Sequence, residues 1–65
     1  MKFTLEFNMD NSAFWFEGEP IREPNYMEQV RILRGVITDI KEFNSEGEII
    51  RDSNGNTIGK WEILP

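Results

Sequence analysis

Hydrophobic and polar residues alternate along the first nine positions of the chain. Phe3, Leu5, Phe7 and Met9 fall on one side of an extended backbone, and the polar residues between them fall on the other. A period of two is typical of a strand with one buried face. The pattern therefore predicts a strand over residues 2–9.

A helical period replaces this alternation from residue 25 onward. Asn25 is suited to cap a helix, and Glu28 three residues later completes a capping-box pattern. Apolar residues then recur at helical spacing on one side, which we call the helix stripe: Tyr26, Val30, Leu33, Ile37 and Ile40. Three further apolar residues widen this side: Ile32, Val36 and Phe43. The pattern predicts a helix over residues 25–43 that packs on a sheet and ends at the turn formers of 44–47.

Residues 48–64 have the pattern of a β-hairpin. Asn54 and Gly55 favour a type I′ turn, because both tolerate the positive φ angles that this turn requires. With that turn, Glu48 lies opposite Trp61 on the apolar face, which is unfavourable for a carboxylate. A bulge or a shifted register is therefore an alternative.

The segment between the first strand and the helix, residues 10–24, is rich in turn formers and surrounds the aromatic residues Phe14, Trp15 and Phe16. It predicts a long loop with a short turn of helix or strand near Phe14. We expect Phe14 to be buried in the small core and Trp15 to be exposed. Long loops in small domains are often functional.

The order strand, loop, helix, strand, strand predicts a single α+β domain over residues 1–65. We expect two layers in a β-α-β-β arrangement, with one amphipathic helix on a three-stranded, mainly antiparallel sheet. The first strand is expected to pair with the last, and Trp61 to form the centre of the core. Gly35 lowers helix propensity by about 1 kcal/mol relative to alanine. This cost predicts a close approach of the helix to the sheet or to an aromatic ring at that position.

The composition argues against catalysis and against a bound cofactor. The chain has neither cysteine nor histidine, so it lacks thiolate metal ligands and the commonest acid–base group. No glycine-rich phosphate-binding motif is present. The turn at residues 52–56 resembles part of a calcium loop but lacks the downstream glutamate of an EF-hand. We therefore expect no catalytic residue, no metal and no cofactor.

The formal net charge is −5, from 12 acidic and 7 basic residues. Such a charge disfavours direct binding to nucleic acid or anionic membranes and favours a basic protein surface, although it also serves solubility alone. No membrane-spanning run or signal peptide is recognised in the sequence. One aromatic residue and four acidic residues are the candidate partner-binding group: Trp15, Glu17, Glu19, Glu23 and Glu28.

Four segments resemble a class of small phage and prophage proteins: residues 3–5, 10–14, 30–34 and 51–61. In that class, an Asp-Asn-x-Ala-Phe step leads to a helix and then to a hairpin with an Asp-x-Asn-Gly-Asn turn. The class includes anti-CRISPR proteins, among them a small type I-C inhibitor with one helix between its first two strands. Residues 15–24 extend beyond the shared pattern.

The resemblance implies an inhibitor that binds a subunit of a type I CRISPR surveillance complex and blocks its recognition of target DNA. We expect it to act as a monomer in the cytoplasm of the bacterial host. The alternative is a phage accessory protein that has no CRISPR target.

Overall fold

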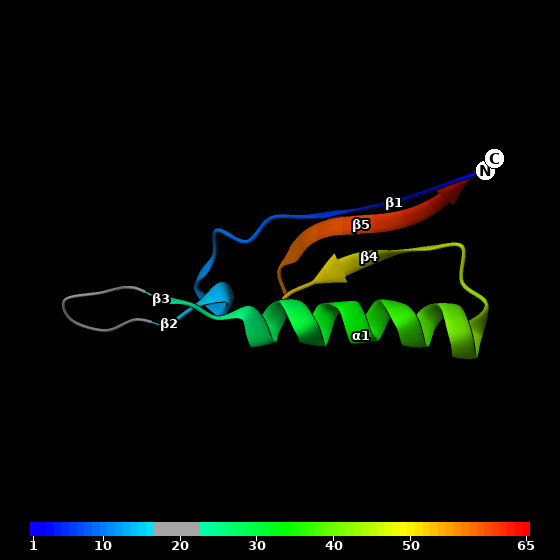
Figure 1. Cartoon of the computed structure of the whole chain (residues 1–65). Helices are drawn as coiled ribbons and strands as arrows, with labels where there is room; N and C mark the ends of the chain where they lie inside the picture. Colours follow the sequence, from blue (N-terminus) through cyan, green and yellow to red (C-terminus); the bar gives the residue numbers. More distant parts are fainter. Residues whose placement is uncertain (17–22) are drawn as a thin grey trace.

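The computed structural model describes residues 1–16 and 23–65. The chain forms the predicted two-layer α+β domain, with one long helix beneath a three-stranded sheet (Figure 1). The two termini lie together at one end, because Lys2 pairs with Leu64. A short two-stranded ladder lies at the opposite end.

The sheet consists of β1 (Lys2–Phe7), β4 (Gly47–Arg51) and β5 (Thr57–Leu64), in the antiparallel order β1-β5-β4. The predicted pairing of the first strand with the last is confirmed. Glu48 lies opposite Trp61, as the hairpin pattern predicted. Leu5 lies opposite Trp61 on the other neighbouring strand. Glu48 stays exposed because β4 is an edge strand.

The turn between β4 and β5 differs from the predicted type I′ turn. Gly55 has a positive φ of 84°, but Asn54 does not, and a type I′ turn needs both. The Gly55 N–H donates to the Asp52 carbonyl at 3.0 Å, and the register shifts after Ile50, where Arg51 pairs with Thr57. The β-bulge, which the sequence analysis gave as an alternative, is therefore present, and the turn is longer than the predicted two-residue turn.

Helix α1 spans Tyr26–Phe43, close to the predicted bounds. The Asn25 side chain caps it by accepting a hydrogen bond from the Met27 N–H at 3.1 Å. The predicted capping box is wrong, because the Asn25 N–H donates to the Phe14 carbonyl and the Glu28 carboxylate binds elsewhere. The helix ends at Asn44, whose φ of 50° is the left-handed conformation common at helix C-termini.

Between β1 and α1, the predicted loop contains three short elements. A 3-10 turn, η1 (Ser12–Phe14), leads to β2 (Trp15–Phe16), which pairs with β3 (Glu23–Pro24). The turn near Phe14 agrees with the sequence prediction. Residues 17–22 of the predicted loop lie outside the described residues.

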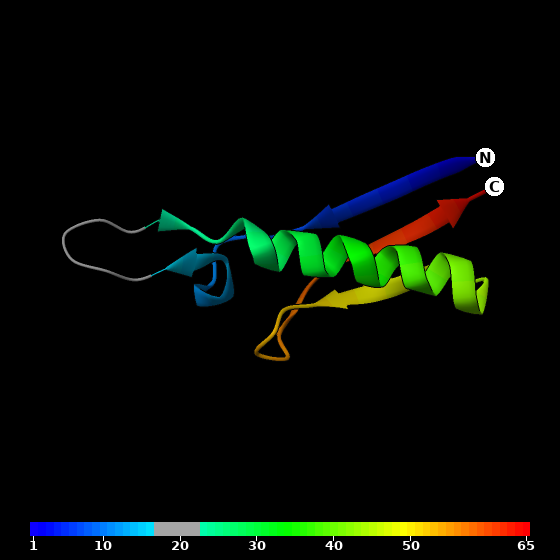
Figure 2. The same ribbon diagram turned by 60° about the horizontal axis from the view of Figure 1, so that its bottom comes forward.

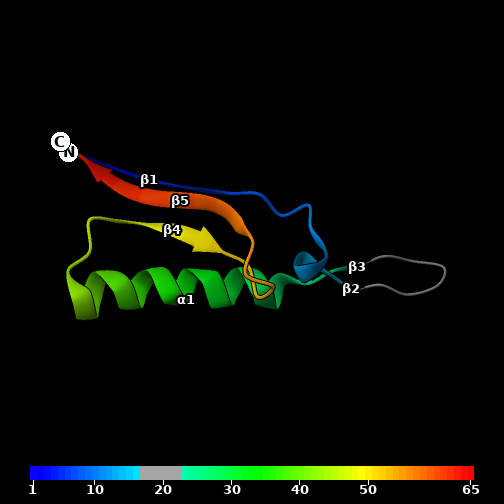
Figure 3. The ribbon, with the colours of Figure 1, turned by 180° about the vertical axis from the view of Figure 1, so that it is seen from behind.

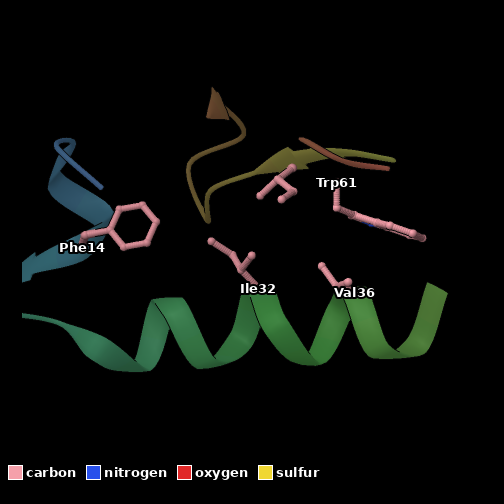
Figure 4. Close-up of a cluster of buried hydrophobic side chains, with 5 residues drawn as sticks. Phe14, Ile32, Val36 and Trp61 are labelled. Carbon is pink, nitrogen blue, oxygen red and sulfur yellow. The ribbon is translucent and has the colours of Figure 1, made fainter. Parts of the chain in front are cut away.

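A small hydrophobic core joins the helix, the sheet and η1. Its buried members are Phe14, Ile32, Val36, Ile50 and Trp61 (Figure 4). Phe14 and Trp61 are both 1% exposed, as predicted, and aromatic stacking extends the core to β1. The ring of Phe3 stacks on Trp61 with centroids 5.7 Å apart, and Phe7 stacks on Phe14 at 6.0 Å.

Gly35 does not have the role that the sequence suggested. A Cβ at this position would meet no atom within 4 Å, so close packing does not require a glycine there. We therefore expect Gly35→Ala to stabilise the domain by up to about 1 kcal/mol, because alanine has the higher helix propensity. Urea denaturation followed by far-UV circular dichroism measures the change. A loss of stability would show that the helix needs a glycine here for another reason.

Candidate protein-binding surface

The helix stripe is largely exposed to solvent. Tyr26 is 62% exposed and Ile37 is 60% exposed, while Leu33 and Ile40 are each more than a third exposed. The helix residues that the sheet covers are instead Ile32 and Val36, which the sequence had assigned to the margin of the apolar side. The helix packs on the sheet as predicted, but through these two residues and not through the stripe.

The rotation of α1 about its axis explains the exposed stripe. Neighbouring residues in a helix are about 100° apart around its axis. The middle of the stripe therefore lies roughly 100° around the axis from the line through Ile32 and Val36. The Arg31 side chain donates to the Arg51 carbonyl of β4 at 3.1 Å, and Arg31, Asp39, Arg51 and Trp61 line one small pocket. The Arg31 side of the helix thus faces β4, and the stripe lies on the other side, toward β1.

The described contacts of Glu28 hold the helix in this orientation. One carboxylate oxygen of Glu28 accepts from the Arg31 guanidinium, and the other accepts from the Ser53 N–H at 2.7 Å. Seen from behind, the β4–β5 turn lies over the first turns of α1 (Figure 3). These bonds tie the start of the helix to the hairpin turn, and the stripe is left uncovered as a result.

The margin of the stripe is basic. Arg34 and Lys41 lie about 60° to 80° round the helix from Tyr26, beside the apolar residues, and both are exposed. Neither makes an ion pair with another described residue. A continuous apolar surface with a polar margin is typical of a protein-binding site.

The sequence contained a signal for this surface. From Ile32 round to Val30, the apolar residues of the helix span about 160°. A helix that packs on one sheet needs an apolar arc of only about 100°. The excess width indicates a second apolar contact, but only the tertiary structure shows which edge of the arc remains exposed.

The predicted acidic site is only partly described. Glu23 in β3 is exposed, and it pairs with Phe16, whose side chain is 57% exposed. Trp15 is half-buried, and its indole N–H donates to the Met9 carbonyl at 3.0 Å, so the side chain is less exposed than predicted. Glu17 and Glu19 lie outside the described residues.

Glu28 does not belong to an exposed acidic surface. Its side chain is buried at 5% exposure, and both carboxylate oxygens bind groups within the chain. The hydrogen bond from Arg31 lowers the pKa of Glu28 and outweighs the effect of burial, and the Ser53 N–H lowers it further. The sequence placed Glu28 at the cap, where glutamate is usually solvated, but the folded chain brings the hairpin turn over it.

Asp52 organises the same turn from the other side. It is 4% exposed, and one carboxylate oxygen accepts from the N–H groups of Asn54 and Asn56, each at 2.9 Å. Burial alone would raise the pKa of Asp52, but hydrogen bonds from Asn56, Asn54 and Asn11 outweigh it, so the pKa is lowered. The part of the turn that resembles a calcium loop thus serves to fix the hairpin.

The lowered pKa of Glu28 makes the stability of the fold depend on pH. Because its folded-state pKa lies below the unfolded value, Glu28 stabilises the fold above about pH 4.5 and loses this contribution as the pH falls through the folded pKa. We expect Glu28→Gln to have a shallower loss of stability on the acid side than the original chain. Melting temperatures measured from pH 7 down to acid pH test this, and identical slopes would contradict the contribution of Glu28.

The described residues have no geometry suited to metal binding. No group of three or more carboxylates within residues 1–16 and 23–65 is arranged to hold a metal ion. The pocket between α1 and β4 is small, about 120 Å³, and two arginines and Asp39 are among its lining residues. The candidate functional surface is therefore the exposed, apolar helix stripe.

Comparison with protein-family models, with curated proteins and with solved structures gave no significant match for this chain.

Among the described residues, no helix combines the length and the apolar content needed to cross a membrane.

Proposed function

We propose that this chain is a binding inhibitor of the anti-CRISPR type, which occupies a subunit of a type I surveillance complex and blocks recognition of target DNA. The observation that carries the binding role is the exposed helix stripe, where Ile37 is 60% exposed on a regular helix. The sequence resemblance to small phage inhibitors supports the choice of target.

The stripe supports binding to a protein because it has the form of an interface centre. Its residues lie on one rigid helix, so little conformational entropy is lost when a partner covers them. Leu33, Ile37 and Ile40 present aliphatic surface, and Tyr26 adds an aromatic ring with a polar tip of the kind enriched at interfaces. The arrangement fits a partner that offers an apolar groove or face.

The acidic residues act at a different step of binding from the stripe. Glu23, together with Glu17 and Glu19, would attract a basic surface and raise the rate of encounter. Glu28 is excluded from this group because it is buried. Attraction between exposed charges weakens with salt, whereas contacts of the stripe act mainly on dissociation.

The test is a competition between this protein and target DNA for a purified type I surveillance complex. We expect inhibition to reach a breakpoint at a fixed molar ratio, because the inhibitor acts by occupying the site. We expect Ile37→Glu to weaken binding at least about tenfold, a loss of about 1.4 kcal/mol. Replacing Glu17, Glu19 and Glu23 by glutamine should slow association and reduce its salt dependence.

A matched control is available on the sheet. Ile49 is 59% exposed and lies on β4, so Ile49→Glu introduces the same charge at the same exposure on another face. We expect it to leave binding unchanged. Equal effects of the two variants would remove the stripe from the interface. Failure of the original chain to bind any type I complex would contradict the proposed target.

A further inference from the structure

Strand β1 forms one border of the sheet, and no other described strand pairs with its outer edge (Figure 2). The strand has six residues, Lys2–Phe7, and contains no proline or glycine. A regular edge strand of this kind presents unpaired backbone groups that can bind another strand. The outward backbone groups and the side chains of β1 indicate which strand can pair with this edge.

The register shows which backbone groups of β1 point outward. The Asn8 N–H donates to the Ile58 carbonyl at 2.9 Å, which makes the even-numbered residues the hydrogen-bonded partners of β5. A Cβ on Gly59 would lie 2.6 Å from the Phe7 Cα, the close approach typical of a pair without hydrogen bonds. The N–H and C=O groups of Phe3, Leu5 and Phe7 therefore face away from β5.

We propose that this edge pairs with β1 of a second copy of the chain, antiparallel and with Thr4 on the two-fold axis. In this register Lys2 lies opposite the partner's Glu6, and Glu6 lies opposite the partner's Lys2. Thr4 faces the partner's Thr4 between them. The N–H and C=O groups of Phe3 form hydrogen bonds with those of the partner's Leu5. Both are odd-numbered residues, whose backbone groups point away from β5.

Charge complementarity favours a second copy over an unrelated strand. Lys2 and Glu6 are symmetric about Thr4, so a two-fold axis brings opposite charges together twice. Neither side chain makes an ion pair with another described residue. Opposite charges and paired threonines are both favourable cross-strand neighbours.

The apolar face of β1 fits the same arrangement. Phe3 is 51% exposed although its ring stacks on Trp61, and Leu5 is half-buried. In the proposed register the partner's Leu5 covers Phe3, and by symmetry Leu5 covers the partner's Phe3. Because the axis is perpendicular to the sheet, both helices lie on the same face of a continuous six-stranded sheet, with their stripes toward the axis. This proposed arrangement differs from the monomer expected from the sequence.

Two charge reversals test the register. Lys2→Glu gives a strand with two acids, and Glu6→Lys gives a strand with two bases, so each variant repels its own copy. We expect the original chain to show a concentration-dependent rise toward twice the chain mass in analytical ultracentrifugation. Each variant alone should dissociate at least about tenfold more readily, and an equimolar mixture of the two should recover association.

A cross-link tests the position of the axis. Thr4 would approach the partner's Thr4 with Cα atoms about 4.5 Å apart, within the range that a disulfide spans. Because the chain has no cysteine, Thr4→Cys should oxidise to a single covalent dimer, while Thr38→Cys on the exposed side of α1 should not. Circular dichroism of each variant shows that the fold is retained.

The proposal is overturned if the original chain remains monomeric at millimolar concentration, or if the mixture of the two reversed variants associates no better than either one. Equal cross-linking of Thr4→Cys and Thr38→Cys would also overturn it. These outcomes are distinguishable from a failure of the proposed function, because the charge reversals change β1 whereas Ile37→Glu changes α1.

Discussion

Replacing Trp61 by alanine is expected to unfold the domain. The indole is 1% exposed at the centre of β5, where Leu5 and Glu48 flank it on the neighbouring strands. Its removal loses the burial of the largest core side chain and leaves a cavity that so small a core cannot fill. Such substitutions cost about 3–5 kcal/mol, which is comparable to the whole stability of many domains of this size.

The measurement is urea or thermal denaturation followed by far-UV circular dichroism. Phe16→Ala is the matched control, because it also removes an aromatic ring, from a side chain that is 57% exposed. We expect this control to change stability by less than about 1 kcal/mol. A folded Trp61→Ala variant with a melting temperature near that of the original chain would contradict the assignment of Trp61 to the core centre.

Gly59→Ala is expected to have a comparable effect for the opposite physical reason. A Cβ at residue 59 would overlap the Glu6 carbonyl oxygen and would lie 2.6 Å from the Phe7 Cα. Both are backbone atoms of β1, so no side chain can rotate away, and the methyl group fits only if β1 moves from β5. We expect a loss of about 3 kcal/mol or more, at the upper end of the range for overpacking.

The same substitution at Gly35 provides the control, because there the added Cβ meets no atom within 4 Å. We expect Gly59→Ala and Gly35→Ala to change the free energy of unfolding in opposite directions when both are measured by urea denaturation. Native stability in Gly59→Ala would mean that the two strands are farther apart than the structure describes.

The local pattern of the sequence was sufficient for the helix, the three main strands and the centre of the core. The alternation over residues 2–9 indicates a half-buried strand, which in the structure ends two residues earlier, at Phe7. Asn25 and Asn44 mark the two ends of the helix through their own side-chain and backbone preferences. Phe14 and Trp61 were predicted to be buried because a small domain has few large apolar side chains with which to form a core.

The candidate site could be predicted only in part. The stripe residues were recognised as apolar, but their exposure depends on the hydrogen bond from the Ser53 N–H to Glu28 and on the one from Arg31 to the Arg51 carbonyl. These bonds join residues that are 25 and 20 positions apart. Periodicity describes neighbours within one helix and carries no information about such contacts.

Periodicity, capping residues and turn formers by themselves thus determined which segments form strands and a helix, how the strands pair, and which two aromatic residues are buried. Each of these properties follows from preferences of nearby residues and from the need to bury apolar surface. The tertiary structure alone decided the rotation of α1, the burial of Glu28, the bulged hairpin turn and the requirement for Gly59. These depend on atoms brought together from distant parts of the chain, where a single close contact outweighs local preference.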